Sequence, residues 1–179
     1  TYLESSKRGS YDPIDFCLSY KDHDGQPVNT KIQQDAQEFL NMIFDKLDRS
    51  LEKTSFKGLL ESVYGGQTSN QFTCKACGYV KENIEMFYNL SLNVKHCKNL
   101  QDSFEKMKEE EIISEYLCGN CKNKCDVSKR CFLKTLPNVL IVHLQKIVFD
   151  LDTMENVKLS SRFEFPMTIN LKQFVAFSQ

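Results

Sequence analysis

Two Cys-x-x-Cys pairs, Cys74–Cys77 and Cys118–Cys121, constrain the fold of this chain more than any other feature. At this spacing two thiolates can reach one tetrahedral metal ion from a single tight turn. Four sulfur ligands in a tetrahedral array are typical of zinc. Because four protein ligands leave no open coordination position, we predict a structural zinc ion rather than a catalytic one.

The interval between the two pairs, residues 78–117, is longer than in a self-contained zinc ribbon. A substantial segment of the fold must therefore lie between the two halves of the metal site. Gly78 follows the first pair and Gly119 lies inside the second, where a glycine allows the positive φ of a tight turn. Two alternatives stay open, namely two unrelated pairs of buried thiols and a redox Cys-x-x-Cys motif.

The composition narrows the class of protein. The 179 residues carry 23 basic and 24 acidic side chains, and a net charge of −1 argues against nucleic acid as a partner. The longest aliphatic stretch, residues 139–144, is too short to span a membrane, and the chain opens without a secretory segment. Four cysteines show no paired spacing: Cys17, Cys97, Cys125 and Cys131. We expect a reducing compartment, hence the cytoplasm or the nucleus, and a chain cut from a longer protein.

An amphipathic helix is predicted from about Asp35 to Lys53. Its apolar residues recur at spacings of three and four, which is the period of one helix face. Asp35 is placed as the N-cap and Glu38 as the third helical residue, an acidic form of the capping box. Capping of this kind stabilises a helix by about 1 kcal/mol.

The second half of the chain has the pattern of strands. Apolar residues alternate from Ile84 to Val94, which predicts one long half-buried strand or two collinear ones. The run from Val139 to Leu144 has no alternation and predicts a central strand covered on both faces. Further predicted elements are a short helix from Asn99, a strand over 131–136, a hairpin turn over 150–156 and a last strand pair around Pro166. The order of elements indicates an α+β fold, with helices first and antiparallel sheet later.

Four ordered motifs resemble one family. Gln33 to Leu40 reads Q-Q-D-A-Q-E-F-L, which resembles the signature of ubiquitin-specific proteases. The two cysteine pairs resemble the zinc knuckles of that family, Leu136 to Leu144 its L-P-x-V-L-x-x-H-L strand, and Phe163 to Pro166 its F-x-F-P step. The resemblance covers the chain from about Tyr11 to Leu171.

The resemblance implies a papain-like cysteine protease domain built of thumb, fingers and palm, which binds ubiquitin and hydrolyses the bond after its C-terminal glycine. Residues 1–62 would belong to the thumb, 63–135 to the fingers with the zinc site, and 136–179 to the palm. The implied partners are ubiquitin and ubiquitinated proteins. The implied metal ligands are Cys74, Cys77, Cys118 and Cys121, around one structural Zn²⁺.

The resemblance also implies ubiquitin contacts at the start of the predicted helix. Asp35 and Glu38 would contact the basic, extended tail of ubiquitin, and Gln33 and Gln37 would assist. The simpler interpretation is a helix cap alone. The two roles are compatible, because a residue that caps a helix can still face a groove.

The catalytic boxes of the family have no match in this chain. Its G-N-T-C-Y-M-N nucleophile box would precede the helix, and Cys17 has none of the neighbours of that cysteine. Its G-H-Y box would follow the F-x-F-P step, and His23, His96 and His143 do not match it. Thiol proteolysis needs a thiolate and an oriented histidine. We therefore expect no catalytic residue in this chain, and no activity from it alone.

Two alternatives remain besides the central part of a deubiquitinase domain. One is a pseudoprotease that binds ubiquitin without cleaving it. The other is a zinc-ribbon module for protein interaction, in which the motif from Asp35 to Leu40 would have no place.

Overall fold

The computed structural model describes residues 5, 7, 9–21, 25–27, 29–33 and 35–176 of the chain. It consists of two compact units, Thr1–Ile43 and Phe44–Gln179. Helix α3, Ala36–Leu51, begins in the first unit and ends in the second.

The first unit contains a short helix that the sequence analysis missed. Helix α2 spans Ile14–Ser19. The Asp12 carboxylate accepts a hydrogen bond from the Ile14 N–H at 3.1 Å, which supports the first turn. Helix α3 follows and agrees with the prediction from residue 35 onward. Its apolar face holds one buried residue, Phe44, whose ring lies against the rings of Tyr64 and Tyr88.

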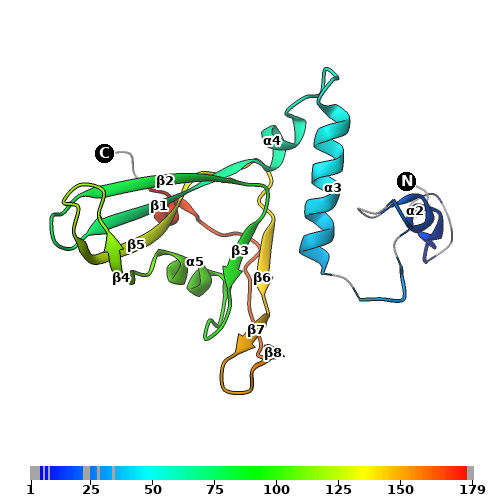
Figure 1. Ribbon diagram of the computed structural model, residues 1–179. Helices are drawn as coiled ribbons and strands as arrows, with labels where there is room; N and C mark the ends of the chain where they lie inside the picture. Colours follow the sequence, from blue (N-terminus) through cyan, green and yellow to red (C-terminus); the bar gives the residue numbers. More distant parts are fainter. Residues whose placement is uncertain are drawn as a thin grey trace. The chain divides into compact units, whose positions relative to one another are not determined.

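The second unit is built on a four-stranded antiparallel sheet, ordered β2-β1-β5-β4. Its long strands run together, and the turns that join β1 to β2 and β4 to β5 lie at the same end (Figure 1). Helix α4, Leu59–Tyr64, leads into the sheet. The strands are β1 (Gly66–Cys74), β2 (Val80–Phe87), β4 (Glu111–Leu117) and β5 (Lys124–Thr135).

The alternating stretch from residue 84 to 94 divides between two sheets. Strand β2 ends at Phe87, and a separate strand β3, Leu90–Asn93, pairs in parallel with β6, Val142–Gln145. The prediction of purely antiparallel sheet is therefore wrong at this pair. The predicted central strand over 139–144 is wrong as well, because β6 is short, half-buried and, in the described part of the chain, paired only with β3.

The remaining elements differ in how well they agree with the patterns. Helix α5, Leu100–Lys108, begins at Asn99, whose side chain accepts a hydrogen bond from the Asp102 N–H. The hairpin of β7, Ile147–Asp150, and β8, Glu155–Lys158, lies where the turn was predicted. The predicted strand pair around Pro166 is wrong. That segment contributes one bridge, between Asn99 and Glu164, and the chain then forms a 3-10 turn over Lys172–Phe174.

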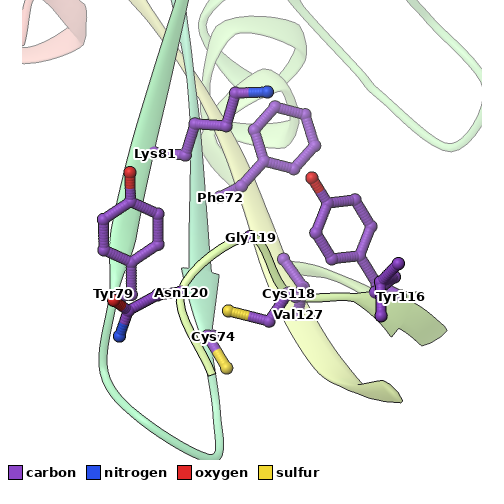
Figure 2. Close-up of a pocket in the computed structure, with 10 residues that line it drawn as sticks. Phe72, Cys74, Tyr79, Lys81, Tyr116, Cys118, Gly119, Asn120 and Val127 are labelled. Carbon is purple, nitrogen blue, oxygen red and sulfur yellow. The ribbon is translucent and has the colours of Figure 1, made fainter. Parts of the chain in front are cut away.

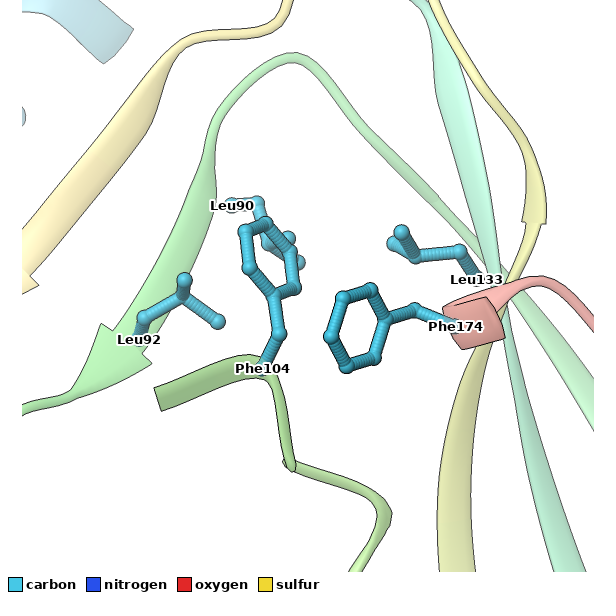
Figure 3. Close-up of a cluster of buried hydrophobic side chains, with 5 residues drawn as sticks. All are labelled: Leu90, Leu92, Phe104, Leu133 and Phe174. Atoms are coloured by element: carbon cyan, nitrogen blue, oxygen red, sulfur yellow. The ribbon is translucent and has the colours of Figure 1, made fainter. Parts of the chain in front are cut away.

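The main hydrophobic core lies where α5, the β3–β6 pair, β5 and the 3-10 turn meet. Phe104 of α5 and Phe174 of the turn are fully buried, with ring centroids 5.0 Å apart (Figure 3). Leu90, Leu92 and Leu133 complete the buried cluster. A second, smaller cluster surrounds Cys74, Cys118 and Val127. Strand β5 contributes a residue to each cluster and so connects them.

Candidate functional site

The first cysteine pair lies on a tight turn at the end of β1. The Gly78 N–H donates to the Cys74 carbonyl at 2.9 Å, and the Cys74 N–H donates to the Tyr79 carbonyl at 2.9 Å. Gly78 has a φ of 71°, in the left-handed region that glycine adopts without strain. The turn thereby brings Cys74 and Cys77 to one side of the hairpin, as the sequence analysis expected.

The second pair repeats the same turn between β4 and β5. The Lys122 N–H donates to the Cys118 carbonyl at 3.0 Å, and the Cys118 N–H donates to the Asn123 carbonyl at 3.0 Å. The residue with positive φ is Lys122, at 61°. The expected role of Gly119 is wrong, because the φ of Gly119 is not positive. In both turns the residue with positive φ directly follows the second cysteine of the pair. This residue is Gly78 in the first turn and Lys122 in the second.

The two turns bring four sulfur atoms together. Those of Cys74, Cys77, Cys118 and Cys121 all lie within 4.8 Å of one another. The sulfur atoms of Cys77 and Cys118 are 3.8 Å apart. A zinc–sulfur bond of about 2.3 Å gives a tetrahedron whose edge is about 3.8 Å, so this spacing fits a metal ion bound by four thiolates. Cys74 and Cys118 are buried, whereas Cys77 is exposed.

Neighbouring groups hold the turns in place. The Asn120 amide donates to the Cys77 sulfur at 3.6 Å. The Lys75 N–H donates to the Asp126 carbonyl at 2.9 Å, which ties the first turn to β5. The Lys75 ammonium forms an ion pair with Glu110. This contact is the main reason why the pKa of the Glu110 carboxyl lies below its usual range. Outer contacts of this kind orient metal-binding thiolates.

A fifth cysteine, which the spacing of the cysteines did not reveal, lies at the site. The Cys125 sulfur is 3.2 Å from the Cys74 sulfur and 3.7 Å from the Tyr116 carbonyl. The two thiols share a hydrogen bond, so the pKa of Cys74 is lowered to about 6 and that of Cys125 is raised to about 12. Cys125 lies two residues before the buried Val127 on β5, and this alternation is the signal that places it on the face of the cysteine cluster.

A hollow of about 370 Å³ borders the cysteines. Its walls include Cys74, Cys118 and the stacked rings of Phe72 and Tyr116. Figure 2 shows the two cysteines at one end of the hollow and Phe72 and Lys81 toward the other. Small molecules can therefore approach the Cys74 side of the centre.

The predicted ubiquitin contacts lie in the first unit. Asp35 caps α3, because its Oδ1 accepts hydrogen bonds from the N–H groups of Gln37, at 2.7 Å, and Glu38, at 3.1 Å. Asp35, Glu38 and Gln33 are exposed, and Gln37 is half-buried. The structure thus supports the capping role directly. Ubiquitin contact by these four residues stays a prediction.

The cysteine and the histidines without a match to the catalytic boxes lie in different elements. Cys17 lies on α2 and is half-exposed. His143 is half-buried on β6. His96 lies in a turn with a φ of 67°, and His23 lies outside the described residues. No helix of the described chain combines the length and the apolar character needed to cross a bilayer.

Comparison with known proteins gives consistent matches. The family model described as ubiquitin carboxyl-terminal hydrolase matches residues 2–179. The chain is 31% identical over 176 residues to ubiquitin carboxyl-terminal hydrolase 9X of Mus musculus, covering 97% of this chain and 7% of that protein. It is 32% identical over 177 residues to ubiquitin carboxyl-terminal hydrolase puf of Drosophila melanogaster, covering 97% of this chain and 4% of that protein. The chain therefore spans a small part of these relatives.

Solved structures match the fold. A chain of the SAGA Ubp8/Sgf11/Sus1/Sgf73 DUB module bound to ubiquitin aldehyde aligns with a TM-score of 0.71 and 27% identity, over 82% of this chain and 34% of that one. A chain of the same module bound to monoubiquitin aligns with a TM-score of 0.72 and 27% identity, over 81% of this chain and 34% of that one.

Proposed function

Because this chain belongs to the ubiquitin carboxyl-terminal hydrolase family, we propose that it is the central part of a deubiquitinating cysteine protease domain. The domain would bind ubiquitin and ubiquitinated proteins and hydrolyse the bond after the C-terminal glycine of ubiquitin, in the cytoplasm or the nucleus. Within it, residues 1–62 would form part of the thumb, 63–135 the fingers and 136–179 part of the palm.

The observation that carries the structural role is the convergence of two equivalent turns on one group of four sulfurs. Each turn has the same pair of backbone hydrogen bonds, although the two arise from different hairpins. Their spacing fits a tetrahedral ion. We assign Cys74, Cys77, Cys118 and Cys121 as ligands of one structural Zn²⁺, which would fix the ends of both hairpins. The turns extend a four-stranded sheet, which argues against an isolated zinc ribbon.

Ubiquitin recognition is assigned to the start of α3. Asp35 and Glu38 present carboxylates at an exposed helix N-terminus, next to Gln33 and Gln37. Such groups suit a cationic, extended peptide, because a charge-assisted hydrogen bond is stronger than a neutral one. The solved relatives bound to ubiquitin support a ubiquitin ligand for this family.

The chemistry of hydrolysis is assigned to residues outside this chain. The reaction needs a thiolate nucleophile and a histidine that takes its proton. None of the cysteine and histidine residues here matches the catalytic boxes of the family. The proposed contribution of this chain is to hold ubiquitin and to keep the fingers rigid.

A fluorogenic ubiquitin substrate tests the proposal on the full-length protein, with this chain alone as a parallel sample. We expect turnover by the full-length protein and none by this chain. Binding of ubiquitin without turnover by the full-length protein would instead favour the pseudoprotease. Neither binding nor turnover in zinc-loaded, folded protein would overturn the proposed function.

A further inference from the structure

The metal centre contains one more thiol than a tetrahedral ion uses. Four cysteines surround the site, and Cys125 lies against one of them, Cys74. Their 3.2 Å separation is shorter than the 3.8 Å between Cys77 and Cys118. Cys125 is therefore beside a metal-binding sulfur without belonging to the set of four.

The backbone holds this thiol pair in register. Cys74 ends β1 opposite Val127 of β5, and Cys125 is the next residue of β5 on the same face. Cys125 is also paired with Tyr116 of β4, which fixes its position in the sheet. Because a disulfide bond is about 2.05 Å long, the two sulfurs need to approach by only about 1.2 Å to form one.

We propose that Cys74 and Cys125 form a peroxide-sensitive thiol pair, in which a disulfide between them removes Cys74 from the metal centre. This inference rests on the proposed zinc centre and adds a mode of regulation to it. The oxidant is hydrogen peroxide or a similarly small hydroperoxide. Reduction by a small thiol reverses the step.

The reaction balances in two steps. The Cys74 thiolate attacks hydrogen peroxide, the O–O bond breaks, and a sulfenic acid and a hydroxide ion form. The Cys125 thiol then condenses with the sulfenic acid, an S–S bond forms and one water molecule leaves. The two sulfur atoms together lose two electrons, and the peroxide gains them.

Within this thiol pair, the surroundings assign Cys74 as the sulfur that reacts first. Cys74 lines the hollow of about 370 Å³, which admits a molecule as small as peroxide. Cys125 is absent from the lining of that hollow and lies against Cys74, in the position of a resolving thiol. After the disulfide forms, three thiolates remain. Structural zinc sites have four ligands, so the protein should release its zinc.

The test treats zinc-loaded full-length protein with hydrogen peroxide and follows zinc release with a chromogenic chelator. Peptide mass spectrometry then identifies the disulfide. We expect a Cys74–Cys125 disulfide that forms in step with zinc release, and release that reverses with a reducing thiol. In Cys125→Ser the release should be at least several-fold slower. Cys131→Ser, which removes another half-buried thiol of β5, is the matched control and should behave as the wild type.

Each alternative outcome is decisive. Equal release rates for Cys125→Ser and wild type would overturn the inference, and so would a wild-type disulfide that joins Cys74 to Cys77, Cys118 or Cys121. If Cys125→Ser fails to retain zinc before oxidation, the test rests on the wild type. A Cys74–Cys125 disulfide in the oxidised wild type then supports the inference, and any other disulfide of Cys74 overturns it. Freshly reduced wild-type protein without zinc would contradict the proposed zinc centre itself, so the two failures are distinguishable.

Discussion

The sulfur atoms of Cys77 and Cys118 lie 3.8 Å apart, although 41 positions separate the two residues in the sequence. The first belongs to the turn after β1 and the second to the turn after β4. The hydrogen bonds within each turn do not require the two turns to come together. A shared metal ion is the simplest physical reason for two exposed turns to converge.

We therefore expect about one equivalent of zinc per chain, measured by metal analysis of freshly reduced protein. Cys118→Ser should lose most of it, because a buried ligand is removed from a closed four-ligand site. It should also lower the melting temperature, since metal affinity in such sites appears as folding free energy, on the order of 10 kcal/mol in zinc-finger peptides. Cys97→Ser is the control and should retain the metal. Equal zinc contents in both variants would contradict the ligand assignment.

A second prediction separates capping from ubiquitin binding at Asp35. Asp35→Asn keeps the cap, because Asn caps a helix about as well as Asp, and removes the charge. In the full-length protein ubiquitin affinity should fall by about 1–3 kcal/mol, the range for a hydrogen bond to a charged group. The loss should shrink at high salt.

Asp35→Ala is the companion variant, because it removes both the cap and the charge. It should lower the melting temperature as well as the ubiquitin affinity, whereas Asp35→Asn should leave the melting temperature nearly unchanged. If ubiquitin binding by Asp35→Asn equals that of the wild type, only the capping role remains.

The strained residue of the second turn gives a third prediction. A left-handed conformation costs a residue with a side chain about 1–2 kcal/mol, and Lys122 adopts it where the first turn has Gly78. Lys122→Gly should therefore raise the free energy of unfolding by up to about 1 kcal/mol, after the larger unfolded-state entropy of glycine is subtracted. Gly78→Ala should be destabilising by urea unfolding. A destabilised Lys122→Gly would show that the lysine side chain has a role of its own.

Acid stability gives a fourth prediction. Glu82 accepts hydrogen bonds from the Ser69 hydroxyl at 2.7 Å and the Lys134 ammonium at 3.0 Å, and these contacts lower the pKa of its carboxyl. Its contribution to stability should thus be present above the unfolded-state pKa and disappear as the pH falls through the lower folded-state pKa. In Glu82→Gln, stability measured between about pH 6 and pH 3 should depend less on pH.

Glu85→Gln removes a carboxylate from the same strand and serves as the control for this measurement. In Glu85→Gln the decrease in stability toward low pH should be almost the same as in the wild type. Parallel pH profiles for wild type and Glu82→Gln would mean that the bridge from β2 to β1 and β5 does not contribute to stability.

The core gives a fifth prediction. Phe104 is fully buried against Phe174, so Phe104→Ala should leave a cavity and lower the free energy of unfolding by about 3–5 kcal/mol. Phe149→Ala, at a site that is 52% exposed, should have a much smaller effect in the same urea titration. Similar losses for both variants would place the core elsewhere.

Local patterns were sufficient for the elements that depend on local contacts. The cysteine spacing predicted both turns, the 3.6-residue period predicted α3, and Asn99 marked the start of α5. Each of these signals reflects hydrogen bonds or packing between residues a few positions apart. The same is true of the hairpin after β7.

Pairing between distant segments could not be inferred in the same way. The apolar run before His143 indicates burial but does not tell which strand lies beside it, and β6 pairs in parallel with β3. The alternation from residue 84 to 94 continues across a change of sheet at Tyr88, whose hydroxyl donates to Asp48 at 3.1 Å. Cys125 was missed for the same reason, because its partner Cys74 is 51 positions away.

The order of pairing in the sheet also has a consequence for synthesis. Strand β1 lies between β2, which follows it at once, and β5, whose Phe132 faces Ser69 across 63 positions, from 69 to 132. At roughly 5–20 residues per second, one edge of β1 waits roughly 3–13 s for its partner on the ribosome. During this time the edge can pair with another chain, and Cys74 and Cys77 have no second pair of thiols to share a metal with. This edge of β1 is therefore covered only once β5 itself has been made, after the second cysteine pair.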